Sequence, residues 1–235
     1  MPNIEITAAD GGTFVGYLSV PKSGKGPGVL LLHAIFGVND ETRGYADEFA
    51  ADGFTALIPE MFWRIERGVD LKPGPEGGKR ALELSTLFNA NVAQGVDDLK
   101  SALATLRKHP ACTGKVGTVG YCLGGKMAYL MALDSDADCN VGYFGVGIER
   151  LLDRAGQLHR PLMLHIPAED SHCPPEAQKA IYAALDGRAE LHTYPEAGHA
   201  FNRVGGRLYN AAATALGQER TQEFLARHLK AAKAA

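Results

Sequence analysis

The chain has 235 residues, of which 46% are hydrophobic, and a formal net charge of -3 at pH 7. This length and apolar content suffice for one large domain with a buried core. The net charge is near neutral, whereas proteins that bind nucleic acid or anionic membranes usually carry an excess of basic residues. No apolar run approaches the roughly 18 residues of a membrane-spanning helix. We therefore expect a single domain over residues 1–235, with neither nucleic acid nor a membrane as partner.

The cysteines and the first residues of the chain indicate a reducing compartment. Residues 1–7 do not show the basic residues followed by an apolar run that are typical of a secretory signal peptide. The four cysteines are irregularly spaced in a long chain, which favours free thiols over a disulfide framework. We expect a cytoplasmic monomer with free thiols at Cys112, Cys122, Cys139 and Cys173.

Predicted strands and helices alternate along the chain. Short apolar runs bounded by Gly or Pro predict strands, and apolar residues at helical spacing predict helices. Asp10-Gly11-Gly12 predicts a hairpin between the first two strands, and residues 64–78 read as a long surface loop. The predicted strands are 4–7, 13–20, 28–33, 54–58, 115–121, 141–146, 161–166 and 190–194. The predicted helices are 41–52, 92–108, 123–133, 175–185 and 208–230, with one more between the loop and residue 92.

This order of elements predicts the fold class. Strands separated by helices form mostly parallel sheets that are covered on both faces. We therefore expect an α/β protein with a mostly parallel central sheet of about eight strands, flanked by helices on both faces.

A nucleophile motif lies between a predicted strand and a predicted helix. Gly120-Tyr121-Cys122-Leu123-Gly124 fits the Gly-x-nucleophile-x-Gly elbow, with cysteine in the serine position. The start of the following helix would direct its amide groups and positive dipole end at the thiol, which favours the reactive thiolate. The backbone N–H of Leu123 would then bind a developing oxyanion. A buried structural cysteine is the alternative interpretation of Cys122.

Two ligand sites are alternatives to this interpretation. Residues 120–127 match most of a phosphate-binding loop, but Met127 stands where that loop needs Ser or Thr for magnesium. A zinc site would use His165, Asp170, His172 and Cys173, but their spacing fits no standard zinc pattern. We expect neither a metal nor a cofactor.

The acid and the base follow the nucleophile in the order expected for α/β-hydrolases. Glu169 and Asp170 come directly after the predicted strand 161–166, and sites in open α/β sheets lie beyond the carboxyl ends of strands. His199 lies in a loop between the last predicted strand and the terminal helix, after Gly198. We predict Asp170 as the acid and His199 as the base. The other histidines suit the role less well. His165 and His192 lie within predicted strands, where packing is the more common role, and His172 is only two residues from Asp170.

Four separated segments carry a family resemblance that extends from about Thr13 to Leu225. They are Ile35-Phe36-Gly37-Val38-Asn39, Gly120-Tyr121-Cys122-Leu123-Gly124-Gly125, Gly142-Tyr143-Phe144-Gly145-Val146-Gly147 and Ala197-Gly198-His199-Ala200-Phe201. In these segments the chain resembles the dienelactone hydrolases (carboxymethylenebutenolidases). The resemblance implies an α/β-hydrolase fold and hydrolysis of dienelactone to maleylacetate, in the degradation of chlorinated aromatics, with no metal and no cofactor.

The resemblance also assigns roles to residues. The family's triad falls on Cys122, Asp170 and His199. A thioester formed on the cysteine would be the intermediate. The second oxyanion donor would be the backbone N–H of Ile35, and the arginines that bind the substrate carboxylate would be Arg203 and Arg80.

Ala34 departs from the family pattern. The family usually carries a glutamate at this position, which holds the resting thiol neutral and turned away. Without it, Cys122 is expected to pair permanently with His199 and to be more reactive and more easily oxidised. Two other functions stay open: a broader carboxylesterase or thioesterase of the same fold, and a catalytically silent ligand-binding member.

Overall fold

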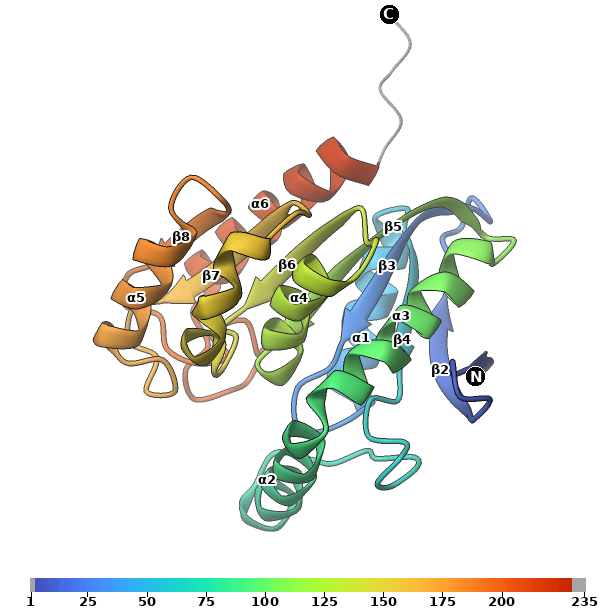
Figure 1. The fold of residues 1–235 in the computed structure, drawn as a ribbon, viewed down its shortest axis with the longest axis horizontal. Helices are drawn as coiled ribbons and strands as arrows, with labels where there is room; N and C mark the ends of the chain where they lie inside the picture. Colours follow the sequence, from blue (N-terminus) through green and yellow to red (C-terminus); the bar gives the residue numbers. More distant parts are fainter. Residues whose placement is uncertain (1–2, 230–235) are drawn as a thin grey trace, which may run out of the picture. The chain divides into compact units, whose positions relative to one another are not determined.

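The computed structural model describes residues 3–229, in which three strands come first and five further strands alternate with helices (Figure 1). The strands are β1 (Asn3–Thr7), β2 (Thr13–Ser19), β3 (Gly26–Leu32), β4 (Thr55–Pro59), β5 (Cys112–Tyr121), β6 (Cys139–Tyr143), β7 (Leu162–Pro167) and β8 (Glu190–Tyr194). Their hydrogen-bonded order is β1-β2-β4-β3-β5-β6-β7-β8. The pairs β1–β2 and β2–β4 are antiparallel, whereas β3–β4, β6–β7 and β7–β8 are parallel. The predicted α/β class and mostly parallel sheet are confirmed.

The chain divides into two compact units, Met1–Thr118 and Val119–Ala235. In the first, β4 is buried along its whole length and β3 along most of it, as their continuous apolar sequences predict. Helix α1 (Asp40–Ala51) packs on β2 and β4, and α3 (Val92–Lys108) packs on β1 and β3. A capping box formed by Asn39 and Thr42 begins α1. These contacts hold the loop that connects β3 to α1.

The predicted loop at 64–78 is wrong at its end, because α2 (Pro75–Ala90) begins inside it. Pro75 occupies the first position of this helix, where a proline fits without loss of a hydrogen bond. The predicted loop contains Gly77. In the structure a Cβ at this position would overlap the carbonyl oxygen of Lys72, so the glycine permits close packing. It therefore does not mark a helix end.

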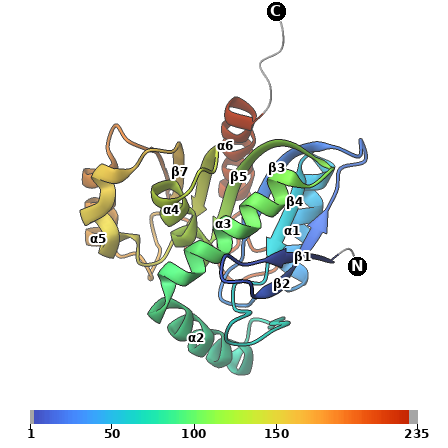
Figure 2. The same ribbon diagram turned by 45° about the vertical axis from the view of Figure 1, so that its right-hand side comes forward.

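In the second unit, β6, β7 and β8 form a parallel sheet with helices on both faces (Figures 1 and 2). A Cβ at Gly142 would meet the backbone of Gly125 in α4 (Leu123–Asp134), whereas the next side chain, Tyr143, reaches α6 (Ala211–Leu229). Because neighbouring strand residues point to opposite faces, α4 and α6 cover opposite sides of β6. Helix α5 (Pro175–Leu185) has the predicted bounds.

The largest other differences from the prediction in this unit are the end of β6, an additional helix and the start of the terminal helix. Strand β6 ends at Tyr143, because Phe144 has a φ of 39° that leaves the extended conformation. A 3-10 helix, η1 (Ile148–Gln157), follows and was not predicted. The terminal helix α6 begins at Ala211 and is described to Leu229, and position 230 lies outside the described residues. Within residues 3–229, every helix is too short or too polar to cross a membrane.

Candidate active site

Cys122 lies on the turn between β5 and α4, where the elbow motif places it. Its φ of 56° and ψ of -112° are rare for a residue with a side chain. The turn is held by the backbone. The Cys122 N–H donates to the carbonyl of Tyr143 at 3.0 Å, and the Cys122 carbonyl accepts from the N–H of Gly125 at 3.0 Å and of Lys126 at 3.2 Å. These bonds keep a strained residue at the N-terminus of α4.

The neighbours of Cys122 fit the roles predicted for an elbow. A Cβ at Gly120 would overlap the carbonyl of Gly124, so only glycine lets the strand and the helix approach this closely. Leu123 is the first residue of α4, and the N–H of a first helical residue has no intrahelical acceptor. That N–H is therefore available to an oxyanion formed on a group bound to Cys122.

The acid and the base candidates meet through a direct hydrogen bond. His199 Nδ1 lies 2.8 Å from Asp170 Oδ2, and the Asp170 side chain is fully buried. Oδ1 of Asp170 accepts the backbone N–H of His172 at 2.8 Å. The loop that carries Asp170 is hydrogen-bonded to the segment after β8, because the N–H of Glu169 donates to the carbonyl of Ala197 at 2.9 Å. Glu169 itself is exposed, so Asp170 is the carboxylate that orients His199.

His199 also contacts the thiol, and its protonation reflects both partners. Burial alone would lower the pKa of His199. Hydrogen bonds to the Asp170 carboxylate and to Cys122 outweigh burial and raise this pKa to about 9. At pH 7 the ring is therefore an imidazolium held between a carboxylate and the sulfur. The structure brings the three residues together in the order predicted.

Strained backbone gathers around these residues, which the sequence did not reveal. Within residues 3–229, the non-glycine residues with positive φ are Cys122, Phe144, Glu196 and Ala200. Ala200 follows His199 directly, and the ring of Phe144 packs edge-on against His199 at 5.0 Å. Backbone strain of this kind clusters at functional sites, where the surrounding fold maintains it.

His172 was set aside as a base, and the structure shows what it contacts. Its ring packs against that of His199 at 4.5 Å between centroids, in an edge-to-face arrangement. His172 is exposed, so its ring covers one side of the His199 ring from the solvent. Spacing alone could not find this contact, because it depends on how the loop after β7 turns.

Both ligand alternatives conflict with the packing. Met127 is fully buried in α4 and cannot face a bound magnesium ion. His165 is also fully buried, with Nδ1 2.6 Å from the hydroxyl of Tyr194 and Nε2 3.0 Å from that of Thr221. Because both ring nitrogens are already engaged, His165 has no nitrogen left for zinc. It belongs to a polar network that joins β7 and β8 to α6.

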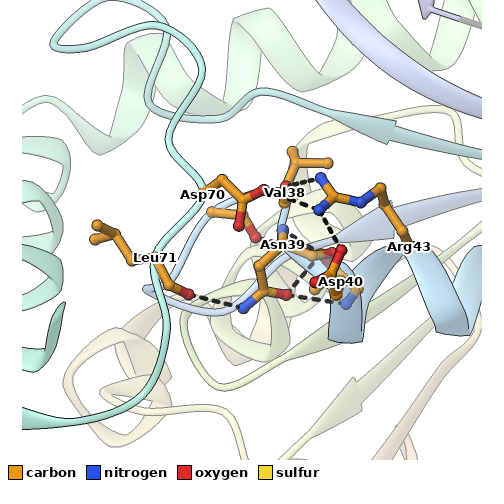
Figure 3. Close-up of polar contacts among 8 residues, drawn as sticks. Val38, Asn39, Asp40, Arg43, Asp70 and Leu71 are labelled. Carbon is orange, nitrogen blue, oxygen red and sulfur yellow. Dashed lines mark hydrogen bonds and ion pairs between the residues drawn. The ribbon is translucent and has the colours of Figure 1, made fainter. Parts of the chain in front are cut away.

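The segment expected to supply the second oxyanion donor lies between β3 and α1. Residues 34–37 form a turn in which the N–H of Gly37 donates to the carbonyl of Ala34 at 3.3 Å. Its far end is fastened to residues 69–71, where the N–H of Val38 donates to the carbonyl of Val69 at 2.9 Å. The guanidinium of Arg43 binds the Val38 carbonyl and two carboxylates, as Figure 3 shows. These carboxylates belong to Asp40 and Asp70.

The two predicted carboxylate-binding arginines have different surroundings. Arg203 is half-buried in the loop that follows His199, and its backbone N–H donates to the carbonyl of Ala200 at 3.0 Å. Arg80 lies on α2 and forms ion pairs with Glu83, at 3.0 Å, and with Glu66. The guanidinium of Arg80 therefore already has two carboxylate partners.

The Dienelactone hydrolase family model matches residues 14–229. The carboxymethylenebutenolidase of a Pseudomonas species is 36% identical over 226 residues, which cover 95% of this chain and 94% of that protein. Carboxymethylenebutenolidase 1 of Cupriavidus pinatubonensis is 34% identical over 226 residues and 95% of each chain. A solved dienelactone hydrolase from Anabaena variabilis shares the fold, with a TM-score of 0.71 at 18% identity over 97% of this chain and 98% of that one.

Proposed function

Because the chain belongs to the dienelactone hydrolase family, we propose that it opens enol lactones such as dienelactone with Cys122 as nucleophile. The observation that carries the proposal is the position of His199, which binds both the Asp170 carboxylate and the Cys122 side chain. Nucleophile, base and orienting acid in this relation define a covalent hydrolase. The chain acts in this proposal as one domain without metal or cofactor.

The protonation of His199 suits the first half of such a reaction. The Cys122 thiolate attacks the lactone carbonyl, and the N–H groups of Leu123 and Ile35 bind the oxyanion. When the carbonyl re-forms, the ring C–O bond breaks and the enolate takes the proton of the His199 imidazolium. This leaves a thioester on Cys122 and a neutral imidazole.

The neutral imidazole then serves the second half. It takes a proton from water as the hydroxide attacks the thioester, and the C–S bond breaks to release a carboxylic acid, which loses its own proton to solvent. The thiolate and the imidazolium are thereby restored. Since a thiolate leaves more readily than an alkoxide, the thioester forms well only from esters with good leaving groups. We therefore expect enol lactones and activated esters to be turned over faster than alkyl esters.

We propose that the substrate carries a carboxylate bound by Arg203. Arginine suits this role because its guanidinium can form two parallel hydrogen bonds with a carboxylate. One observation favours a broader carboxylesterase or thioesterase instead: Arg80, the second arginine that the family implies, is paired with Glu66 and Glu83. In Arg203→Ala, an at least tenfold rise in KM for an acidic lactone but not for a neutral ester would support the acidic substrate.

A Cys122→Ala variant tests the proposal directly. We expect it to lose enol lactone hydrolysis, whereas the wild-type protein gives a burst of product and an acylated Cys122 that mass spectrometry detects. Unimpaired turnover by Cys122→Ala would contradict the mechanism. Absence of labelling by both an activated ester and a thiol reagent would favour a catalytically silent member.

A further inference from the structure

His33 is a buried polar residue to which the proposed reaction gives no role. It follows the last residue of β3 and is 1% exposed. Its ring lies edge-on to Phe62, with centroids 5.1 Å apart. Both ring nitrogens have partners: Nδ1 lies 2.7 Å from the carbonyl oxygen of Ala34, and Nε2 lies 3.1 Å from the backbone nitrogen of Met61.

These two partners determine where the proton of the His33 ring lies. The Met61 N–H can only donate, so Nε2 accepts and carries no proton. Burial lowers the pKa of His33 to about 4, although the hydrogen bond to Ala34 opposes this shift. The ring is therefore neutral at pH 7, and its single proton lies on Nδ1. That N–H donates to the Ala34 carbonyl.

The Ala34 carbonyl and the Ile35 N–H belong to one peptide group. The group is planar and trans, so its C=O and its N–H point in opposite directions. Fixing the direction of the Ala34 oxygen therefore fixes the direction of the Ile35 N–H. That N–H has no acceptor among residues 3–229, as expected for a central residue of a turn.

The rest of the turn is held from Phe36 onward, where the Phe36 carbonyl accepts the N–H of Leu71 at 2.9 Å. Val38 and Asn39 are fastened to residues 69–71 and to Arg43 (Figure 3). At the peptide between Ala34 and Ile35, two donors fix the carbonyl: the weaker bond from the Gly37 N–H at 3.3 Å and the short bond from His33. His33 is thus the side chain that sets the orientation of this peptide.

We propose that His33 is a positioning residue, which aims the Ile35 N–H as an oxyanion donor by holding the Ala34 carbonyl. The role rests on the proposed function, because Ile35 needs an aimed N–H only if an oxyanion forms. The side chain of His33 itself touches no reacting atom in this role. Its contribution is preorganisation, which lets the donor act without reorganising during the reaction.

Two substitutions separate the two hydrogen bonds of the ring. The amide nitrogen of asparagine can occupy the place of Nδ1, so His33→Asn keeps the donor to Ala34 and loses the acceptor for Met61. The amide oxygen of glutamine can occupy the place of Nε2, so His33→Gln keeps the acceptor and loses the donor. The Met61 N–H loses its acceptor in His33→Asn, whereas the Ala34 carbonyl keeps the bond from the Gly37 N–H in His33→Gln. We therefore expect His33→Asn to be the less stable variant, so a loss of acylation confined to His33→Gln is not explained by stability.

The readout compares two reactions of Cys122. Acylation by p-nitrophenyl acetate develops an oxyanion, whereas alkylation by iodoacetamide does not. Removing an oxyanion donor costs about 10²–10³ in rate, and a misdirected donor should cost less. We expect His33→Gln to slow the acylation burst about ten- to a hundredfold and His33→Asn to stay within about threefold of wild type. Both variants should be alkylated at the wild-type rate.

Each outcome decides between the two proposals. Wild-type acylation by His33→Gln, or equal losses in both variants, would overturn the role of His33 while leaving Cys122 as nucleophile. Turnover that survives in Cys122→Ala would overturn the proposed function and this role with it. Nitrogen NMR of the wild-type protein gives a test that needs no variant to fold: a His33 proton on Nε2 at pH 7 would refute the argument.

Discussion

Asp170→Asn is the substitution for which the structure gives the sharpest expectation. Two donors face the buried carboxylate: the His172 backbone N–H at 2.8 Å and the Nδ1–H of His199 at 2.8 Å. An asparagine of the same shape offers one acceptor oxygen and one NH₂ group. If its oxygen keeps the bond to His172, its NH₂ must face His199 Nδ1. That nitrogen then has to accept, which places the ring proton on the nitrogen meant to act as base.

The size of the effect follows from the protonation of His199. Its pKa of about 9 lies well above the ordinary 6.5, although burial alone would lower it. Each pKa unit corresponds to about 1.4 kcal/mol of interaction that favours the protonated ring. Without the carboxylate, we expect the pKa of His199 to fall by about two units or more. In serine hydrolases the same substitution costs about 10⁴ in kcat because it imposes the wrong tautomer, and we expect a loss of about 10³–10⁴ here.

The assay combines a proton NMR titration of His199 with the rate of enol lactone turnover. Glu169→Gln is the matched control, because Glu169 is the neighbouring carboxylate and is exposed. We expect this control to keep both the pKa and the rate of the wild type. A His199 that still titrates near pH 9 in Asp170→Asn would refute the reasoning, because the carboxylate would then not be what holds the proton.

Three further predictions concern the elbow, the pH dependence and the resting thiol. Gly120→Ala should destabilise the protein by about 2–4 kcal/mol, measured by urea unfolding, because its methyl group would overlap a backbone carbonyl that cannot move freely; a loss below 1 kcal/mol would contradict this contact. Because His199 keeps its proton up to about pH 9, kcat/KM for an enol lactone should fall as the pH rises through 9. Acylation by p-nitrophenyl acetate, whose leaving group needs no proton, should lack this fall, and identical profiles would count against proton delivery by His199. Ala34→Glu, which restores the residue usual in the family, should slow alkylation of Cys122 by iodoacetamide at least fivefold; an unchanged rate would show that the alanine does not set the resting state.

Much of the fold was predictable because its signals are local. Helices α3 and α5 and strand β8 have the predicted bounds, since each combines a clear period with flanking breakers. The predicted boundaries were wrong where the same residue type is compatible with two local structures. Gly77 lies in the first turn of α2, where close packing requires glycine, and β6 stops at Tyr143 although the apolar run continues to Val146.

The triad candidates were predictable from their order along the chain, since strand topology carries sequence order into space. The contacts around them were not. Phe144 and His172 both pack on His199, but one follows β6 and the other follows β7. Which faces of two loops meet depends on backbone angles such as the positive φ of Phe144, and no local pattern in the sequence encodes such an angle.

The position of the groups along the chain separates activation of the nucleophile from the oxyanion donor proposed at Ile35. Cys122, Asp170 and His199 all lie in Val119–Ala235, whereas His33 and Ile35 lie in Met1–Thr118. In the proposed mechanism, thiolate formation depends on the first set, so alkylation reports on that set and does not respond to His33 or Ile35. In the same proposal, acyl transfer depends on both sets. Substitutions in the first set should therefore lower alkylation and acylation together, whereas substitutions at His33 should lower acylation only, and that difference distinguishes a poorly activated thiol from a poorly aimed oxyanion donor.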